Sequence, residues 1–305
     1  MRWVMVMTAA CHTFLTRLLC YCHMALLIFS CILFQGKNMK LRYRSVWISD
    51  THLGTKGCKA EYLRDFLDHI ECETLYLVGD IIDVWSWNAK SGFYWPLLHS
   101  DIVQRIIDKA RQGTRVVYIP GNHDDVFRKH AGIVFNGIEI HLNTVHTTAD
   151  NRRFLVMHGD EFDSIVCHNR SLAHIGGEAY ELLLVINRWF NNIRKMMGYQ
   201  YWSLSAYLKH RVKNIIKFMD NFQHVLSLEA DKQQVDGVIC GHIHHAQMNA
   251  MESGKIYCNT GDWVESCTAL VEDDKGEMSL IHWLEDSHRL LDKNQHDRDK
   301  WMEAA

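Results

Sequence analysis

The chain has very little proline and no repetitive sequence. Only Pro96 and Pro120 occur among 305 residues, and no internal repeat or low-complexity tract is present, so nothing indicates a disordered chain. Basic residues are also not in excess over acidic ones, with 33 Lys and Arg against 36 Asp and Glu. The formal net charge is -3, which argues against a generic nucleic-acid-binding protein because counterion release requires a basic surface, although a local basic patch remains allowed. With 48% apolar and 23% charged residues, the composition is that of a globular protein with one large core or two modest ones.

A disulfide framework is absent as well. The ten cysteines include no C-x-x-C pair and follow no regular spacing, so we expect free, buried thiols in a reducing compartment. Histidine, in contrast, is abundant. The chain has twenty histidines, and histidine is the commonest protein ligand for transition metals.

One long apolar run stands near the N-terminus. Residues 18–34 read LLCYCHMALLIFSCILF, and a basic segment follows. Residues 1–38 are therefore a hydrophobic leader with three interpretations. They could form a short membrane anchor whose basic flank keeps the remaining chain in the cytoplasm. They could also be codons upstream of a true start at Met39. A cleaved secretory signal is less favoured, because no small-residue cleavage site follows the run.

From Arg44 onward, short apolar runs typical of buried strands alternate with helical patterns, which predicts an α/β core. Beyond His245 the pattern predicts strands without helices, and hence a mixed sheet or a second sheet packed on the first. The strands expected in the first part are SVWIS before Asp50, TLYLV before Gly79, RVVYIP before Gly121, RFLVM before His158 and DGVIC before Gly241. Those expected in the last part are KIYCNT, CTALVE and EMSLIHW.

The interval of about 165–230 breaks this rhythm because it contains no strand candidate. Apolar residues from Leu204 to Leu226 recur three or four positions apart, which predicts a long helix packed against another helix. We expect a helical insertion within a domain of residues 39–305. The insertion either fills its own core, or caps the site with an apolar slot for acyl chains and a basic mouth for anionic groups. The basic residues considered for substrate binding are Arg188, Arg194, Lys195 and Lys209.

All five strands of the first part end in residues that bind metals. In α/β sheets, ligands bind beyond the carboxyl ends of the strands, so we expect these five segments to meet in one crevice. Each motif alone is weak evidence, but five in order are a strong signal. The segments are Asp50-Thr51-His52, Gly79-Asp80, Gly121-Asn122-His123-Asp124, His158-Gly159-Asp160 and Gly241-His242-Ile243-His244.

These residue types predict a centre for two divalent ions. Two ions about 3.5 to 4 Å apart can share one carboxylate, and Asp80 is the natural bridge. We expect Asp50 and His52 to lie on an extended segment, so that both side chains point to the same side and bind one ion. Glycines at 79, 121, 159 and 241 would allow sharp turns beside the ligands. Ligands of Asp, His and Asn, with no cysteine among them, favour Mn²⁺ over a structural Zn²⁺.

The segment G-H-I-H-H contains three histidines in four positions. Residues two apart on an extended segment lie about 6.5 to 7 Å apart on one side. We therefore expect His242 and His244 to serve different ions. His245 would point the other way and take no part in binding metal.

The motifs D-x-H, G-D-x-x-D, G-N-H-D, H-G-D and G-H-x-H, in this order, resemble those of the calcineurin-like metallophosphoesterase superfamily over about Ser45 to Trp263. The resemblance implies a four-layer α/β/β/α sandwich with a helical cap insertion. Longer stretches resemble a narrower group, the UDP-2,3-diacylglucosamine diphosphatases of lipid A synthesis and their relatives. These stretches are SDTHLGTKGC, YLVGDIID, GNHDD, MHGDEFD and YCNTGDWVESCTALVE.

The superfamily resemblance also implies roles for individual residues. His123 would protonate the leaving oxygen or steady the phosphoryl group, and Asp83 would hold it in place. Asn122 and His123 would both contact the substrate. One metal ion would be held by Asp50, His52, Asp80 and His244, and the other by Asp80, Asn122, His158 and His242.

The third motif departs from the narrower group. The best-known diphosphatases have G-N-R-D, whereas this chain has His123, as in the wider superfamily. Both an arginine and a protonated histidine stabilise phosphoryl charge, so hydrolysis is compatible with either residue, and the difference bears on the identity of the substrate.

The narrower resemblance implies cleavage of UDP-2,3-diacylglucosamine to UMP and the lipid 1-phosphate with two Mn²⁺ ions. It places the protein in the cytoplasm, peripheral to or anchored at the inner membrane face, with no obligate protein partner. Nucleic acid is not expected as a partner because the chain has no basic excess. The alternative is hydrolysis of another diphosphate, phosphodiester or phosphoprotein. A binding module without catalysis is disfavoured because no ligand position is lost.

Several polar and aromatic residues near the motifs have two open interpretations. The acidic and amide side chains could contact the substrate or could be structural, and the tryptophans could line the crevice or simply pack. The residues in question are Asp160, Asp163, Asn259, Asp262, Trp85, Trp87 and Trp95.

Overall fold

The computed structural model describes residues 40–85, 94–163 and 219–292. We describe the compact unit Arg42–Leu290. The leader 1–38 lies outside the described residues, and so does most of the predicted insertion, with its four basic candidates. At the end of the insertion, residues 219–232 form a helix, as the apolar spacing predicts. Within the described ranges, no helix combines the length and apolar character needed to cross a bilayer.

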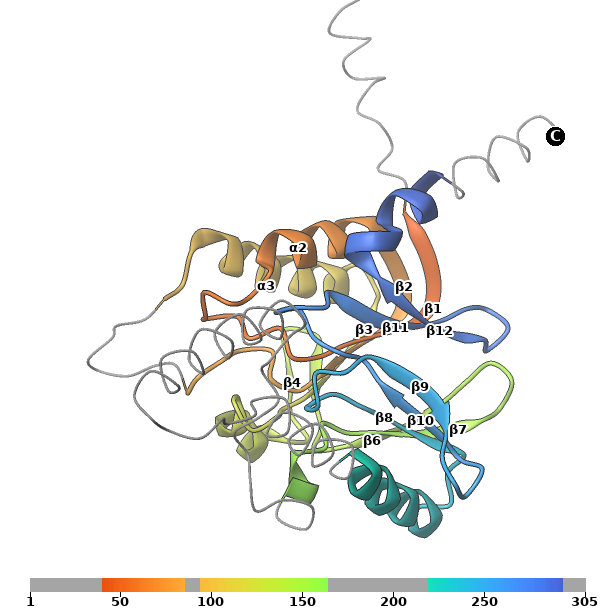
Figure 1. Ribbon diagram of the computed structural model, residues 1–305. Coiled ribbons are helices and arrows are strands. Elements are labelled where there is room, and N and C mark those ends of the chain that lie inside the picture. The colour runs from red at the N-terminus through yellow and green to blue at the C-terminus, as the bar shows by residue number, and fades with distance from the viewer. Residues whose placement is uncertain (1–39, 86–93, 164–218, 293–305) are drawn as a thin grey trace, which may run out of the picture. The chain divides into compact units, whose positions relative to one another are not determined.

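A mixed seven-stranded sheet has the order β12-β11-β1-β2-β3-β5-β4 (Figure 1). Strands β2, β3 and β5 pair in parallel, whereas β1 pairs with β11, β11 with β12, and β4 with β5 in antiparallel fashion. The bounds are β1 Leu41–Ile48, β2 Ile70–Val78, β3 Arg115–Ile119, β4 Val134–Phe135, β5 Ile138–Ile140, β11 Thr268–Glu272 and β12 Met278–His282.

A second sheet has five strands in the order β6-β7-β8-β10-β9. Its centre is parallel, and β6 and β9 pair antiparallel at its edges. The strands expected beyond His245 are thus divided between the two sheets. The bounds are β6 Thr144–Thr147, β7 Arg153–Val156, β8 Gly237–Cys240, β9 Gln247–Ala250 and β10 Ile256–Asn259.

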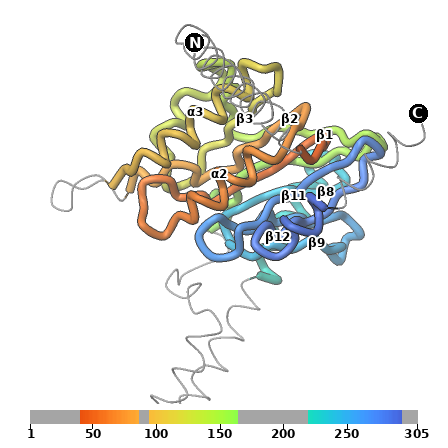
Figure 2. The backbone as a smooth tube through the Cα atoms, turned by 90° about the horizontal axis from the view of Figure 1, so that it is seen from above, coloured from red at the N-terminus to blue at the C-terminus, as the bar shows by residue number. Residues whose placement is uncertain are grey.

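Helices α2 (Ala60–His69) and α3 (Leu97–Arg111) lie side by side over the seven-stranded sheet (Figure 2). Each buries the apolar stripe predicted from its spacing, with Leu63 and Phe66 on α2 and Ile102 on α3 fully covered. Two short 3₁₀ helices, η1 (Asp125–His130) and η2 (Asp160–Phe162), follow the ends of β3 and β7.

The two sheets enclose one apolar core, and a second core lies beneath the helix 219–232. Trp47 and Val117 of the first sheet meet Phe154 and Ile239 of the second. On the outer face of the second sheet, Phe222 and other apolar residues of the helix cover strands β7, β8 and β10. The predicted four-layer α/β/β/α arrangement is therefore confirmed. All five described cysteines are free thiols, as expected; Cys240, Cys258 and Cys267 are buried, whereas Cys58 and Cys72 are only partly buried.

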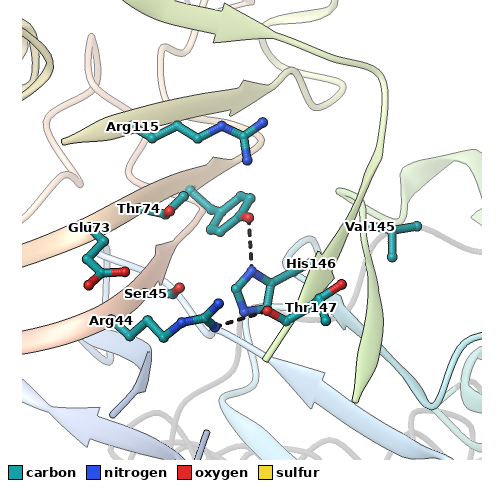
Figure 3. Close-up of a pocket in the computed structure, with 9 residues that line it drawn as sticks. Arg44, Ser45, Glu73, Thr74, Arg115, Val145, His146 and Thr147 are labelled. Carbon is teal, nitrogen blue, oxygen red and sulfur yellow. Dashed lines mark hydrogen bonds between the residues drawn. The ribbon is translucent and has the colours of Figure 1, made fainter. Parts of the chain in front are cut away.

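A buried polar chain joins the two sheets through Tyr76 of β2, Glu272 of β11 and His146 of β6. The Nε2 of His146 lies 2.8 Å from Oε2 of Glu272, and its Nδ1 lies 3.0 Å from the hydroxyl of Tyr76. Arg44 also donates to Glu272, at 2.7 Å. These groups border a polar cavity of about 260 Å³ that Arg115 and His146 help to line (Figure 3). We assign this network to holding the sheets together.

Candidate metal centre

Five of the predicted metal ligands have left-handed backbone conformations. Their φ angles lie between 47° and 68°, and among the described residues only four other non-glycine positions have positive φ. The expectation of extended segments at 50–52 and 242–244 was therefore wrong. Left-handed conformations are unfavourable for residues with a Cβ and are concentrated at functional sites. The five residues are Asp50, His52, Asp80, His242 and His244.

Backbone hydrogen bonds between two loops stabilise this conformation at Asp50 and His52. The amide of Asp50 donates to the carbonyl of Gly79 at 3.0 Å, and that of His52 donates to Asp80 at 2.9 Å. The loop after β1 is thus bound, residue by residue, to the loop after β2. Both loops turn away from the strand direction together, which directs their side chains into one space beyond the strand ends.

The predicted ligands converge in two groups, and His52 and Asp80 also form a third, overlapping group with His123. Potential ligand atoms of Asp50, His52 and His244 lie within 4.8 Å of one another. Those of Asp80, His158 and His242 do the same. The grouping agrees with the two ligand sets implied by the superfamily resemblance, and it places His242 and His244 in different sets.

Asp80 occupies the position expected of a bridging ligand. Its Oδ2 lies 3.4 Å from Nε2 of His158 in one group and 4.0 Å from Nε2 of His52 in the other. His245, in contrast, is exposed and belongs to neither group. The ligand assignments remain predictions, and the arrangement of the side chains is compatible with all of them.

Unsatisfied polar atoms show that the site fits divalent cations. Seven buried side-chain polar atoms of the described residues lack a hydrogen bond, and three of them are Oδ1 of Asp50, Oδ1 of Asn122 and Nε2 of His158. Two of the three lie beside a charged group, since Oδ1 of Asp50 is 3.1 Å from Nε2 of His244 and Nε2 of His158 is 3.4 Å from Oδ2 of Asp80. Unpartnered buried polar atoms are costly and rare. All three belong to predicted ligands, and all are of the hard or borderline type that divalent ions prefer.

Two histidine rings are oriented by contacts through their second nitrogen. The Nδ1 of His158 lies 3.0 Å from the carbonyl of Val78, to which it donates, so Nε2 is left to face Asp80. The Nε2 of His242 lies 2.7 Å from Oδ1 of Asp163, which leaves Nδ1 as its candidate ligand atom. Such outer contacts set the tautomer and orientation of metal-binding histidines.

The carboxylates make the centre strongly attractive for positive charge. Burial raises the pKa of Asp50, but the adjacent His244 outweighs it and lowers that pKa below its usual value. The pKa of Asp80 is likewise lowered, against burial, by His158. Burial opposes a charge on His158, yet Asp80 raises its pKa to about 10. The centre therefore favours cations, whether as protons on imidazoles or as metal ions, and metal binding would release protons.

His123 lies beside the two groups in the position expected of an acid. Its Nδ1 is 2.9 Å from Oδ2 of Asp83, and its backbone amide donates to Asp80 at 2.8 Å. Burial would lower the pKa of His123, but the bond to Asp83 raises it, so the protonated form is favoured. The same Asp83 oxygen lies 3.1 Å from Nδ1 of His52. Asp83 thus holds both rings, as expected for a positioning group, and the catalytic role of His123 stays a prediction.

Asp124 is a positioning residue that the sequence reasoning missed. Its buried carboxylate accepts hydrogen bonds from the backbone amides of Gly121 at 2.5 Å and Ile81 at 2.8 Å, and from the Tyr118 hydroxyl at 2.6 Å. It therefore ties the loop after β3 to the loop that carries Asp80. The available signal was its place as the fourth residue of G-N-H-D.

Glycine is required in two of the motifs mainly because a side chain would collide with the predicted ligands. A Cβ at Gly121 would overlap the carboxylate of Asp80 and the ring of His158, and a Cβ at Gly79 would overlap the same ring. Gly79 also has a φ of 78°, which suits the predicted turn. The ligands can lie against the backbone only because these positions lack side chains.

The acidic and amide residues left open by the sequence have structural contacts. Asp160 pairs with Arg128 at 2.6 Å. Asn259 donates to the carbonyl of Gly241 at 2.6 Å and so fixes the start of the G-H-I-H loop. Asp262 accepts hydrogen bonds from three successive backbone amides, of residues 264, 265 and 266. Asp163 differs from these three residues, because its Oδ1 lies at hydrogen-bond distance from Nε2 of the predicted ligand His242.

The tryptophans differ in their surroundings. Trp85 is 54% exposed, and its ring centroid lies 4.5 Å from that of His123. Trp95 packs its ring edge-on against His99 and donates to Ser100 at 2.8 Å. Trp87 lies outside the described residues. Trp85 is thus the tryptophan that borders the candidate centre among those described.

Comparison with known proteins identifies the family. Residues 43–246 match the family model described as calcineurin-like phosphoesterase. The chain is 27% identical over 212 residues to a UDP-2,3-diacylglucosamine hydrolase of Photorhabdus laumondii, covering 66% of this chain and 81% of the relative.

Solved structures similar to this chain include an archaeal phosphodiesterase with 14% identity and a TM-score of 0.37, covering 78% of this chain and 98% of that one. A hypothetical protein from Pyrococcus horikoshii has 10% identity and a TM-score of 0.42, covering 85% and 94%. The match of the family model over most of the chain shows that the protein belongs to the calcineurin-like phosphoesterases, a family of metal-dependent phosphoester hydrolases.

Proposed function

We propose that the protein is a dinuclear-metal hydrolase that cleaves the diphosphate of UDP-2,3-diacylglucosamine to UMP and 2,3-diacylglucosamine 1-phosphate. The observation that carries the proposal is the pair of ligand groups that meet at Asp80, with His123 beside them. The similarity to the Photorhabdus laumondii hydrolase supports the substrate. We propose Mn²⁺ as the metal because the ligand set is rich in oxygen and imidazole donors and has no thiolate.

Bound divalent ions would lower the pKa of a water nucleophile and neutralise charge on the phosphate oxygens. The protein's own residues then have distinct tasks. Asp80 belongs to one ligand group and lies 4.0 Å from Nε2 of His52 in the other, so it would be available to both sites. His123, held by Asp83 through Nδ1, presents Nε2 to donate a proton to the leaving oxygen. No covalent enzyme intermediate is required in this scheme.

The proposal includes contact with the cytoplasmic face of the inner membrane. The segment around β4 exposes apolar side chains: Ile133 is 51% exposed, and Val134 and Phe135 are each 64% exposed. Exposed Lys129 and His130 precede this segment at the end of η1. An apolar tip beside basic residues suits a surface of anionic lipids. This segment comes after η1, which directly follows the G-N-H-D motif in the chain.

A second candidate function is hydrolysis of another diphosphate or phosphodiester. It is favoured by one observation, the histidine at position 123 where the best-known diphosphatases have arginine. The predicted ligand set suits this alternative equally, because bound metal ions would act on the phosphate group that both kinds of substrate share.

The two candidates can be separated with purified full-length protein and Mn²⁺. UDP-2,3-diacylglucosamine and a bis-aryl phosphodiester are offered in parallel, and UMP and aryl alcohol are quantified. Release of UMP at a rate well above that of the Asp80→Ala variant supports the proposal. Turnover of the aryl ester alone favours the second candidate. An Asp274→Ala variant serves as the control, since Asp274 is an exposed carboxylate of the turn between β11 and β12.

A further inference from the structure

Trp85 is exposed beside the candidate centre, unlike the other tryptophans of the cores. Trp47 and Trp263 are fully buried and Trp283 is 1% exposed, whereas Trp85 is 54% exposed. An indole is a large apolar surface, and leaving half of it in water forgoes the free energy that burial provides. A binding partner that covers the ring would recover this free energy.

The indole of Trp85 packs against the ring of His123. Its ring lies 4.5 Å from the ring of His123, with 33° between the two planes. The backbone just before it is anchored as well, because the amide of Val84 donates to the carbonyl of His123 at 3.0 Å and the amide of Asp83 donates to Leu53 at 2.8 Å. His123 in turn is bonded to Asp83. Trp85 is therefore a partly exposed aromatic ring that packs against His123 at the edge of the candidate centre.

We propose that the exposed surface of Trp85 is a stacking site for the nucleobase of the substrate. The inference rests on the proposed function, since it assigns a position to the uracil of the nucleotide half. Among the parts of that substrate, the phosphates suit the metal ligands and the acyl chains require an enclosed apolar slot. The base is the one planar aromatic part, and flat rings stack on indole with little dependence on base identity. Trp85 would thus select nucleotide substrates over diphosphates that lack a base.

The experiment compares the binding of two ligands that share a phosphate but differ in the base. Titration calorimetry with the full-length, Mn²⁺-loaded protein measures the Kd of UMP and of methyl phosphate. The wild type, Trp85→Ala and Trp85→Phe are compared. Tyr62→Ala serves as the control, because Tyr62 is also an exposed aromatic residue, on helix α2.

We expect Trp85→Ala to weaken UMP binding by roughly 5- to 150-fold, the range seen when a stacked aromatic is removed, while methyl phosphate binding is unchanged. Trp85→Phe should restore most of the preference for UMP. Equal weakening of both ligands would mean that Trp85 only supports His123, and unchanged binding of both would mean that it contacts neither. Either result overturns the inference.

The result is independent of the lipid substrate. If UDP-2,3-diacylglucosamine is not hydrolysed but UMP binding still depends on Trp85, the proposed function fails and the base site stands. If the lipid nucleotide is hydrolysed and UMP binding does not depend on Trp85, the reverse holds. Thermal unfolding of each variant checks folding, which substitution of an exposed side chain should leave intact.

Discussion

His158 and Asp80 follow strands of different sheets, yet Nε2 of the imidazole lies 3.4 Å from Oδ2 of the carboxylate. The contact joins the loop after β2 of the seven-stranded sheet to the loop after β7 of the five-stranded sheet. It means that the candidate centre exists only when both sheets are packed together. The centre is therefore a product of the sandwich and not of either half.

Replacing Asp80 should disrupt both ligand groups at once. We expect Asp80→Ala to lower kcat by more than about 100-fold and to reduce the bound metal, because single outer contacts of metal ligands already contribute 10- to 100-fold. Elemental analysis of the purified variant and initial rates with saturating Mn²⁺ measure the two effects. Undiminished hydrolysis would refute the assignment of Asp80 as the shared ligand.

The contact between Asp163 and His242 should affect metal affinity more than catalysis. Asp163→Asn removes the charged partner of Nε2 of His242, and we expect metal affinity to fall by about 10- to 100-fold. Activity titrated against Mn²⁺ should recover at high metal concentration. His245→Ala is the matched control, since His245 is exposed and outside both groups, and its metal dependence should equal that of the wild type.

Position 123 should distinguish acid catalysis from charge stabilisation. We expect His123→Ala to lower kcat by roughly 10²- to 10⁴-fold with little change in metal content, because a general acid contributes in that range. His123→Arg should retain part of the lost rate if stabilising phosphoryl charge is the main task. If both variants are equally impaired, proton donation is the main task. Steady-state rates with UDP-2,3-diacylglucosamine and with the bis-aryl phosphodiester measure the loss of kcat, and elemental analysis measures the metal content of each variant.

The buried Glu272 should make the fold sensitive to acid. Burial opposes its ionisation, but His146 and the amide of Ala149 outweigh this and lower the pKa of Glu272. A carboxylate whose pKa is lower in the folded state stabilises the protein above its unfolded pKa of about 4.3, and this contribution is lost as the pH falls through the folded pKa. We expect Glu272→Gln to lower the free energy of unfolding by about 2 kcal/mol at pH 7.

Urea unfolding of the wild type and Glu272→Gln at pH 7 and below pH 4 measures this effect. The difference between the two proteins should shrink at the lower pH. Glu277→Gln, an exposed glutamate near the same hairpin, should match the wild type at both values. A difference that stays constant with pH would contradict the role of the Glu272 charge.

The exposed segment around β4 should govern membrane contact. We expect Phe135→Glu to weaken binding to vesicles that contain anionic lipids by about tenfold or more, since burying one large apolar side chain contributes about 1.5 to 3 kcal/mol. Co-sedimentation measures the bound fraction. Leu228→Glu alters another side chain that is more than half exposed, on the helix 219–232, and should bind as the wild type does. Equal binding by all three proteins would exclude this segment as the contact.

Local patterns were sufficient for the elements of the core. The five apolar runs that precede the ligand motifs correspond to β1, β2, β3, β7 and β8. The helical stripes of α2 and α3 bury the residues predicted from their spacing. These features follow from the sequence because side-chain alternation and helical periodicity depend only on neighbouring residues.

Backbone conformation at the ligands could not be predicted in this way. Extended geometry was expected at Asp50, His52, His242 and His244, whereas all four are left-handed. The cause is non-local: hydrogen bonds such as that from His52 to Asp80 join loops from different parts of the chain. The expected separation of His242 and His244 nevertheless agrees with the two groups, although the reason given for it does not hold.

The sequence by itself determined the order of the strands along the chain, the identity of the ligand-type residues and their position at strand ends. These follow from local periodicity and residue chemistry. Only the tertiary structure decided which nitrogen of His158 and His242 is left for a metal, that Asp124 ties two loops together, and that Trp85 is exposed beside His123. Each depends on a contact between segments far apart in the chain, and such contacts form only when the two sheets close on each other.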